Sequence, residues 1–397
     1  MYSLRTWASI LVCVTALVVA TDPFKVGIMS KDPEFVANYG RVEPWKGPSA
    51  LPSDPLNRLQ QARILRTPDF GGPESLAFDG QGRGPYTGVA DGRIMRWNGP
   101  DIGWTYFAHT SPNWTDTCIP KNPSAPNFER EHICGRPLGL RFNKTSGDLY
   151  IADAYFGIMV VSVDGGLARS LTVEAENQRF TFTNDLDIDA DGSIYFTDTS
   201  SKYSRRQFVL TAFAWDDSGR LLRYNTITKE TTVLKQGLVA PNGVSLSKDG
   251  SFLVFAEGIA ARLMRYWLKG PNAGQMELFA ASPGHPDNVR RNQKGDFWVA
   301  MHCKRSRFIM QTSPYPWIRS VLARLPIPLS SIYSLMLGAR PHAMVARFSE
   351  SGELLQVLED SEGKVVKTVS EAEERDGVLW ISSAIFPQLA LFSLEKL

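Results

Sequence analysis

The sequence predicts an all-β protein, a six-bladed β-propeller with a long inserted lid segment in blade five. From Ile64 onward, short runs of β-branched and aromatic residues alternate with turns rich in Gly and Asp, and no long helical period interrupts them. In addition, six segments share one plan: a strand, a turn ending at or near Gly, and an aromatic-rich strand. A closed ring of such units protects its strand edges, whereas a parallel α/β fold needs crossover helices.

The six repeated segments follow one another along the chain. They read GPESLAFDGQG, GRPLGLRFNKTSGDLYIAD, TNDLDIDADGSIYFTD, APNGVSLSKDGSFLVFAE, HPDNVRRNQKGDFWVA and SEAEERDGVLWIS. The strands predicted in this region include residues 92–97, 147–152, 192–197, 219–224, 252–255, 295–300 and 377–382. Self-similarity of this kind is typical of repeat architectures, each unit of which buries its apolar face against its neighbours.

The charge balance excludes one class of function. The chain has 397 residues, of which 43 are Lys or Arg and 41 are Asp or Glu, for a formal net charge of +2. A nucleic-acid binder would show a basic stripe, and the sequence has no long run of one charge. We therefore expect no nucleic-acid partner and a small molecule as substrate or ligand.

The amino-terminal residues 1–20 are predicted to form a signal peptide. Arg5 precedes an apolar stretch from Ala8 to Ala20, which is short for a membrane span but typical of a secretory signal. An uncleaved anchor is the alternative. The secretory route predicts an oxidising environment, with the vacuole, the endoplasmic reticulum and the cell exterior as candidate compartments.

Cysteines and glycosylation motifs agree with that route. Cys118 and Cys134 lie in a Pro- and Asn-rich loop, where a disulfide would contribute roughly 3 kcal/mol in the chain-entropy model. Cys303 is left over as a buried thiol at a strand end. Asn113 in Asn-Trp-Thr and Asn143 in Asn-Lys-Thr are candidate glycosylation sites.

Between the signal and the repeats, residues 21–60 are Pro-rich and irregular, which predicts a leader that wraps around or docks on the propeller of residues 61–397. A second irregular segment, about 304–342, interrupts the fifth unit. It is apolar and punctuated by basic residues. We interpret it as a lid over the propeller face, because long structured loops tend to cover sites. Residues 306–339 could alternatively make a peripheral membrane contact.

The stretch from Asp187 to Asp198 resembles an EF-hand calcium loop in its spacing of acidic residues. Its flanks do not, because residues 180–183 and 194–197 are β-formers, whereas an EF-hand loop lies between helices. The alternation of Leu186 and Ile188 with acidic residues has the period of a strand. We therefore predict a hairpin with a solvated acidic turn at Asp189–Gly192.

Taken together, several motifs resemble the strictosidine synthase and strictosidine synthase-like family, which includes the adipocyte plasma membrane-associated proteins. The matching motifs are GPESLAFDGQGRGPYTGVADGRIMRW, CGRPLGL, IYFTDTS, GRLLRYNTITKETTVL, RYWLKGPNAG and PDNVRRNQKGDFWVA, and the resemblance covers about residues 60–397. It implies a six-bladed propeller, in agreement with the repeats. The cysteine pair of the TC…ICGR loop also resembles the family's disulfide.

The resemblance to strictosidine synthase implies a Pictet–Spengler condensation that depends on one essential Glu. That Glu precedes the Asp of a late Glu-x-Asp-Gly motif by six residues, and counting back from Asp376 gives Ser370. A serine cannot perform the proton transfers of a carboxylate at neutral pH. Glu371 is adjacent, but successive side chains of a strand point to opposite faces. The catalytic position of the family is thus lost at Ser370.

The same propeller superfamily includes the paraoxonases, gluconolactonases and diisopropylfluorophosphatase, which are calcium-dependent hydrolases. Similarity to them implies one Ca²⁺ ion in the central channel, held by oxygen ligands from the inner strands. The residues that match are Glu74, Asn184, Asn242, Asp287 and Asn288. Carboxylate and amide oxygens are the ligands that such a hard cation selects. Asp185 and Asp287 are the candidate catalytic residues, as activators of a water molecule.

The paraoxonases carry a channel His near the position of Leu138, and this His is absent here. His285 and His302 flank the fifth unit and could face the channel, although each is interpreted first as a structural or exposed side chain. The leading hypothesis is a hydrolase of small esters or lactones supported by Ca²⁺. The alternatives are a Pictet–Spengler lyase, which Ser370 disfavours, and a non-catalytic glycosylated propeller that binds through its faces.

Overall fold

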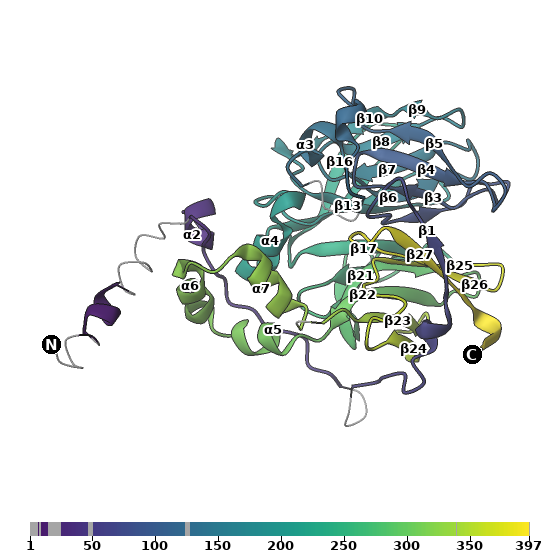
Figure 1. Cartoon of the computed structure of the whole chain (residues 1–397). Coiled ribbons are helices and arrows are strands. Elements are labelled where there is room, and N and C mark those ends of the chain that lie inside the picture. Colours follow the sequence, from purple (N-terminus) through teal and green to yellow (C-terminus); the bar gives the residue numbers. More distant parts are fainter. Residues whose placement is uncertain are drawn as a thin grey trace.

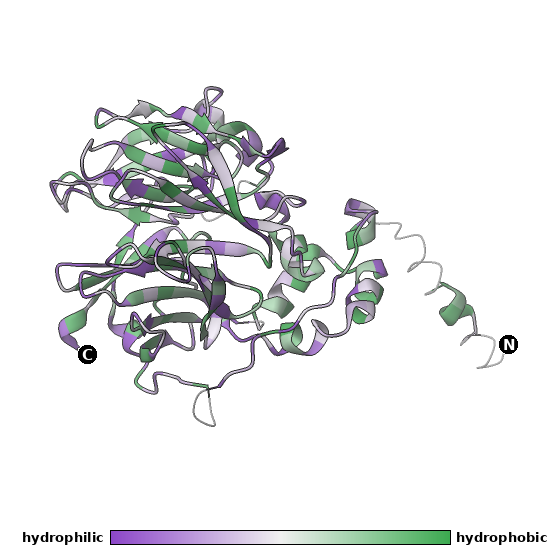
Figure 2. Ribbon diagram, turned by 180° about the vertical axis from the view of Figure 1, so that it is seen from behind, coloured by the Kyte–Doolittle hydropathy of each residue, from purple (hydrophilic) through white to green (hydrophobic). Residues whose placement is uncertain are grey.

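The computed structural model describes residues 7, 9–14, 25–46, 51–123, 128–338 and 340–396. Its six large sheets, which are antiparallel except for one short parallel pair, form a ring, and this confirms the six-bladed propeller (Figure 1). A small hairpin of β11 (Glu174–Ala175) and β12 (Gln178–Arg179) projects from it. Several strands, such as β8 (Gly157–Val161) and β18 (Phe252–Glu257), are buried along their whole length, as expected for strands between neighbouring sheets, and hydrophobic segments recur throughout the blades (Figure 2).

The strands of each blade follow one another in sequence. Blade one holds β2 (Leu76–Ala77), β3 (Tyr86–Gly88), β4 (Arg93–Trp97) and β5 (Trp104–His109), with β9 (Gly166–Leu167) parallel to β5. Blade two holds β6 (Pro137–Phe142), β7 (Leu149–Asp153), β8 (Gly157–Val161) and β10 (Arg169–Thr172). Blade three holds β13 (Thr183–Ile188), β14 (Ile194–Asp198), β15 (Gly219–Tyr224) and β16 (Thr231–Leu238).

The remaining blades continue the pattern. Blade four holds β17 (Pro241–Leu246), β18 (Phe252–Glu257), β19 (Arg262–Trp267) and β20 (Met276–Ala281). Blade five holds β21 (Gly284–Arg291), β22 (Phe297–Lys304), β23 (Ala343–Phe348) and β24 (Leu354–Asp360). Blade six holds β25 (Glu371–Arg375), β26 (Val378–Ser382), β27 (Gln388–Ser393) and the amino-terminal β1 (Arg63–Arg66).

The ring closes through blade six, where the two ends of the propeller share one sheet. Strand β1 pairs antiparallel with β27, and Arg63 lies opposite Leu391. The first strand of the fold thus completes the last blade, and the ring has no open edge between its first and last units.

The Asp187–Asp198 stretch is a hairpin, as the sequence predicts. Strands β13 and β14 pair antiparallel, with Ile188 opposite Ile194. The turn between them is closed by hydrogen bonds from the Asp189 amide to the Ser193 carbonyl and from the Gly192 amide to the Asp189 carbonyl. The acidic spacing therefore belongs to a strand and its turn.

Helices cover one side of the propeller. The blade-five insertion between β22 and β23 folds into α5 (Arg307–Thr312), α6 (Pro316–Arg324) and α7 (Leu329–Met336). A further helix, α4 (Phe208–Ala214), follows the short 3₁₀ helix η3 (Arg205–Gln207) in blade three. Helix α4 was not predicted from the sequence, although a capping box between Ser204 and Gln207 marks the start of η3, which leads directly into α4. Figure 1 shows α4, α5, α6 and α7 together on this side.

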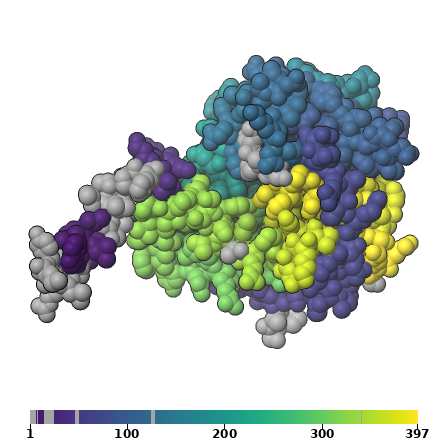
Figure 3. All heavy atoms as spheres, viewed as in Figure 1, coloured from purple at the N-terminus to yellow at the C-terminus, as the bar shows by residue number. Residues whose placement is uncertain are grey.

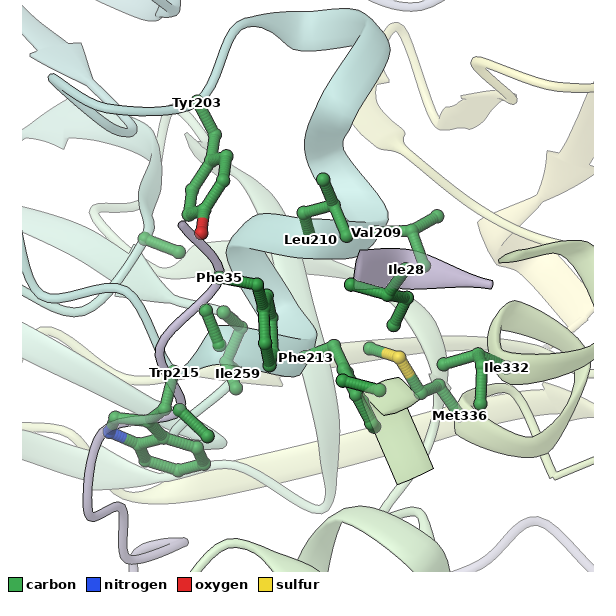
Figure 4. Packing of buried hydrophobic residues seen from close by; sticks show 14 of the residues in the cluster. Ile28, Phe35, Tyr203, Val209, Leu210, Phe213, Trp215, Ile259, Ile332 and Met336 are labelled. Atoms are coloured by element: carbon green, nitrogen blue, oxygen red, sulfur yellow. The ribbon is translucent and has the colours of Figure 1, made fainter. Parts of the chain in front are cut away.

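These helices share one apolar core with the leader. Phe213 of α4 stacks on Phe35 of the leader, with ring centroids 5.6 Å apart, and Ile332 and Met336 of α7 lie in the same cluster (Figure 4). Backbone hydrogen bonds tie the leader down at three points, from Asn38 to Ala214, from Gly40 to Ser313 and from Glu43 to Ala260. The leader therefore runs across the helical cap before it reaches β1.

Other short helices complete the described structure: α2 (Ile28–Lys31), η1 (Arg58–Gln61), η2 (Asp116–Cys118), α3 (Glu131–Cys134) and η4 (Leu394–Lys396). The predicted signal peptide lies mostly outside the described residues, except for a helical stretch at 9–14. No helix in the described parts of the chain has the length and hydropathy that crossing a membrane requires. Trp317 and Val321 of α6 are exposed, and the membrane contact through 306–339 stays a prediction.

A disulfide joins Cys118 and Cys134 across a separation of 16 residues, which confirms the predicted pair. Both cysteines are fully buried, and the bridge ties η2 to α3 beside blade two. Cys303 is a buried free thiol, as predicted. Asn113 is exposed and Asn143 is half-buried, and glycosylation of either residue stays a prediction.

Replacing both Cys118 and Cys134 with Ser should lower the free energy of unfolding by about 3 kcal/mol, because the open loop gains entropy in the unfolded chain. Equilibrium denaturation of wild type and double variant measures the difference. Reductant should reproduce the loss in the wild type and leave the double variant unchanged. A double variant as stable as the wild type would contradict the prediction.

Candidate functional site

A pocket lies where the inner strands of the propeller meet the helical cap. It contains about 1040 Å³ of atom-free space, part of which is open to solvent. Glu74, Asn184, Asn242 and Asp287 line it on the propeller side, and Ile309, Tyr333 and Met336 line it from the insertion. The inserted helices therefore line one side of the pocket as a lid. Figure 3 shows the insertion, in green, packed against the rest of the propeller.

Three inner strands present their candidate ligands at equivalent irregularities. Each strand breaks its pairing register near its start, at residues 183–186 in β13, 241–244 in β17 and 286–289 in β21. Asn184, Asn242 and the Asp287–Asn288 pair occupy these breaks. A β-bulge re-aims side chains that a regular strand would direct elsewhere. In blade two the same break, at residues 137–139, holds Leu138 and supplies no ligand.

Close packing of the inner strands around the bulges requires glycine. A Cβ atom on Gly139 would lie 2.7 Å from the Asp185 Cα, and one on Gly243 would lie 2.4 Å from the Asn288 Cα. Both distances are shorter than van der Waals contact between carbon atoms, so any larger residue would push the neighbouring strand away. These two glycines keep the candidate ligands of adjacent blades close together.

Four buried oxygen atoms of the candidate ligands have no hydrogen-bond partner among the described residues. They are Oε2 of Glu74 and the amide oxygens Oδ1 of Asn184, Asn242 and Asn288. The amide nitrogens of two of them are occupied, since Asn184 donates to the Thr199 hydroxyl at 2.9 Å and Asn242 donates to Asp287 at 2.6 Å. Each amide group is thus held by its nitrogen, and its oxygen is left without a hydrogen bond. Buried polar atoms are normally satisfied, so four orphaned acceptors indicate a missing positive partner.

The Glu74 carboxyl group carries the electrostatic signature of such a site. Burial raises its pKa to about 8, the positive charge of Arg136 opposes this shift, and the charge of Asp287 adds to it. In the absence of a cation, burial thus disfavours the deprotonated, negatively charged form of Glu74. A bound cation would reverse this balance, because metal binding favours deprotonated ligands.

The donor set fits Ca²⁺. Within the described parts of the chain, no group of three or more His, Cys, Asp or Glu side chains could hold a metal. The candidate set combines two carboxylates with three amide oxygens, and hard oxygen ligands of this kind suit Ca²⁺ better than softer transition metals. Of the set, Asn288 does not line the pocket, although its amide oxygen is equally buried.

Asp185 lies in a separate layer of the channel. Its carboxylate accepts two hydrogen bonds from Arg290, at 2.5 and 2.9 Å, and a third from the Val244 amide at 2.9 Å. Arg290 also binds Glu371 at 2.7 Å and the Ser75 hydroxyl at 2.9 Å. Since all of these side chains are buried and Asp185 does not line the pocket, we assign it a structural role in place of the predicted catalytic one.

We call the buried group of Arg290, Asp185, Glu371 and Ser75 the Arg290 layer. It includes Glu371, the sequence neighbour of Ser370, where the family's catalytic Glu is lost. Ser370 is buried, and its hydroxyl accepts a hydrogen bond from the Ala384 amide. Glu371 points away from Ser370 into the Arg290 layer, as the alternation of a strand predicts. Among the described residues of β25, none lines the pocket, so this strand presents no carboxylate to a substrate.

His302 is the histidine that joins the site. It lines the pocket, its Nε2 lies 2.8 Å from the Tyr333 hydroxyl, and its Nδ1 lies 3.8 Å from Asp287 Oδ2. From the sequence alone, His302 is interpreted first as a structural or exposed side chain. Its pairing with Tyr333 of the lid depends on the fold of α7, which the sequence does not show. Burial raises the pKa of the nearby Cys303 thiol to about 12, which disfavours its nucleophilic thiolate form at neutral pH.

His285 also lines the pocket, but both ring nitrogens are occupied. Nδ1 lies 2.8 Å from the Gly258 carbonyl, which requires a proton on Nδ1, and Nε2 accepts a hydrogen bond from the Ser306 amide at 3.0 Å. Burial lowers the pKa of His285 to about 4. It is therefore a neutral structural histidine that anchors the start of α5.

This buried imidazole predicts a loss of stability in acid. The unfolded chain binds a proton on His285 below pH 6.5, whereas the folded protein resists it down to about pH 4. Stability should therefore fall as the pH decreases through this window, by about 2 kcal/mol between pH 7 and pH 5. His285→Gln should remove that part of the pH dependence in denaturation experiments. The matched variant His132→Gln, at an exposed histidine, should retain it.

Arg205 is a functional candidate that the sequence analysis missed. It is 8% exposed, lines the pocket, and its Nη1 is buried with no hydrogen-bond partner among the described residues. The rings of Phe128 and Phe208 lie on it, with centroids 5.4 and 4.9 Å from Cζ. The Ser204–Gln207 capping box fixes the start of this helix and is the one sequence signal that could have drawn attention to Arg205.

The fold and the site together define a class: a six-bladed propeller with an oxygen-lined pocket in its central channel, covered by an inserted helical lid. Comparison with known proteins is consistent with this class. The strictosidine synthase family model matches residues 184–271, and the strictosidine synthase-like amino-terminal model matches residues 55–97. Two relatives that match over most of the chain show the family.

Protein strictosidine synthase-like 3 of Arabidopsis thaliana is 51% identical over 383 residues, which cover 96% of this chain and 97% of that protein. The adipocyte plasma membrane-associated protein of Salmo salar is 36% identical over 352 residues, 86% of this chain and 80% of its own. The chain belongs to the strictosidine synthase-like family.

Solved structures show the same fold at low sequence identity. A gluconolactonase from Xanthomonas campestris has a TM-score of 0.54 and 16% identity, and covers 90% of this chain and 98% of its own. The calcium-binding protein regucalcin from Agrobacterium tumefaciens has a TM-score of 0.52 and 14% identity, and covers 83% of this chain and 92% of its own.

Proposed function

We propose that this protein hydrolyses small esters or lactones at a calcium site in its central pocket. The observation that carries the proposal is the set of four buried side-chain oxygens without partners, from Glu74, Asn184, Asn242 and Asn288. Asp287 completes the set as a second carboxylate. Ca²⁺ bound there would supply a Lewis acid that polarises the carbonyl group and stabilises the oxyanion.

The chain's own residues supply proton transfer and water exclusion. Asp287 is held by the Asn242 amide on Oδ1 and faces the His302 ring with Oδ2, so it is placed to accept a proton from a water molecule. His302, which Tyr333 orients, is the neighbouring group that stabilises the charge of Asp287. The apolar side chains of the cap cover part of the pocket and reduce its access to bulk solvent.

The reaction consumes only the ester or lactone and one water molecule. The water oxygen forms a bond to the acyl carbon while its proton passes to Asp287, and the bond from the acyl carbon to the alkoxy oxygen breaks. The alkoxy oxygen then takes up the proton, so the products are an acid and an alcohol, or a hydroxy acid from a lactone. No redox partner is needed.

The test is to measure metal content and turnover of phenyl acetate and small lactones, with and without chelator, for wild type and Asn184→Ala. We expect one Ca²⁺ per chain and turnover that falls with chelator and with the variant. Asp189→Asn in the exposed β13–β14 turn is the matched control and should behave as wild type. Bound Ca²⁺ without turnover above buffer would instead support the non-catalytic binding propeller, and absence of Ca²⁺ would overturn the proposed site.

A further inference from the structure

The pocket holds a positive charge that the proposed hydrolytic machinery does not use. Arg205 lies at the start of the cap, in η3, and lines the same pocket as Glu74 and Asp287. Among the described residues, no carboxylate makes an ion pair with it within 4.0 Å. A buried arginine is normally paired, because an isolated buried charge is costly.

Neighbouring acids do not satisfy this guanidinium directly. The negative charges of Glu131 and Glu74 act on it, with the hydroxyls of Tyr155 and Tyr333 also nearby. Glu131, however, accepts a hydrogen bond from Tyr155 and lies 3.8 Å from the Arg136 Nε. Glu74 belongs to the proposed calcium site. Arg205 thus keeps its positive charge and lacks a bonded anion.

The aromatic rings around Arg205 do not satisfy its Nη1 donor. Cation–π contacts with Phe128 and Phe208 stabilise the charge through the faces of those rings but accept no N–H hydrogen bond in the guanidinium plane. Its buried Nη1 therefore remains an unused donor. A planar carboxylate matches such a donor edge better than any neutral group does.

Between Arg205 and the candidate metal ligands, much of the pocket wall is apolar. Leu138, Phe182, Val209, Ile259 and Met336 line it together with the aromatic residues of the cap. A ligand that satisfies the whole pocket needs an anionic end at Arg205, an apolar body, and an oxygen-bearing group that faces the candidate metal ligands. These three requirements describe a small amphiphilic acid.

We propose that Arg205 binds a free carboxylate of the substrate, so that the pocket selects esters or lactones that also carry a carboxylate. This specificity rests on the proposed hydrolase function, but the anion site itself can be tested without catalysis. The carboxylate would fix the orientation of the substrate and leave its reacting carbonyl toward Asp287 and the candidate calcium ligands. Arg205 is a specificity residue and takes no part in bond cleavage.

Binding is measured first, with two probes of the same shape. Isothermal titration of the calcium-loaded protein with 4-phenylbutyrate and with neutral 4-phenylbutanamide should show at least about 10-fold tighter binding of the acid, the range expected for a charge-assisted hydrogen bond. Arg205→Gln should bring the two affinities within about twofold of each other. Arg206→Gln, at the exposed neighbouring arginine, should retain the wild-type preference.

A conservative variant and a turnover assay distinguish failure of the anion site from failure of the hydrolase function. Arg205→Lys keeps a positive charge and should retain part of the preference, so it supports or overturns the proposal even if Arg205→Gln fails to fold. Turnover of mono(4-nitrophenyl) glutarate against 4-nitrophenyl butyrate reports on catalysis. Preferential binding of the acid without turnover of either ester would uphold the anion site and defeat the hydrolase function. Equal affinities for acid and amide in the wild type would overturn the role of Arg205.

Discussion

Replacing Glu74 with Gln should weaken calcium binding by about 100-fold or more, because the variant removes one of only two carboxylates among the candidate ligands. Gln keeps the size of the side chain and one oxygen, so the effect measures the lost negative charge. Titration calorimetry gives the affinity directly. Thermal unfolding provides a second reading: calcium at 100 times the wild-type Kd should stabilise the wild type by about 2.7 kcal/mol, whereas a variant with 100-fold weaker binding should gain only about 0.4 kcal/mol at the same concentration.

The control for this experiment lies in the β13–β14 turn. Asp189 and Asp191 occupy the stretch that resembles an EF-hand, and both bind backbone amides of their own turn. Asp189→Asn and Asp191→Asn should leave calcium affinity unchanged within about twofold. If these variants lose calcium and Glu74→Gln does not, the metal is bound at the hairpin, and the channel site is wrong.

A second large effect is expected at Arg290, which holds Asp185, Glu371 and Ser75 together across the channel. Arg290→Met should lower the free energy of unfolding by about 3–5 kcal/mol, because two buried carboxylates lose their positive partner. Equilibrium denaturation measures the loss. A further triple variant that adds Asp185→Asn and Glu371→Gln should regain part of it, since the uncompensated charges are then gone.

An exposed ion pair provides the comparison. Arg223 lies 3.5 Å from Asp191 at the propeller surface, with side chains that are 36% and 57% exposed. Arg223→Met should cost at most about 1 kcal/mol, because solvent screens such a pair. If Arg290→Met and Arg223→Met destabilise the protein equally, the Arg290 layer does not hold the inner strands together, and the role assigned to Asp185 is wrong.

The repeats made the architecture predictable from sequence, because strand and turn signals are local. The runs 92–97, 219–224 and 377–382 form strands β4, β15 and β26 as predicted. Helix α4 escaped prediction, since residues 208–214 are apolar on nearly every side and lack the amphipathic period of a surface helix. It is stable because the leader and α7 cover it.

The candidate site was predictable only in part. The positions of Asn184, Asn242 and Asp287 follow from the repeats, because equivalent positions of equivalent units line the channel. The partners of Asp185 could not be inferred, since Arg290 lies 105 residues further along the chain and nothing local marks the pairing. For the same reason Tyr333 and Arg205 were missed: their access to the pocket depends on how two separate helices pack over it.

The pairing of β1 with β27 also constrains the order of events when the protein is made. Arg63 is synthesised well before its partner Leu391, because more than 300 residues lie between them. Until β27 has been synthesised, blade six is incomplete and β1 lacks its pairing partner. Contacts this distant in sequence form slowly, so the incomplete ring depends on protection from aggregation during synthesis. Removal of β1 or of β27 would leave a propeller whose sixth blade lacks one of its four strands.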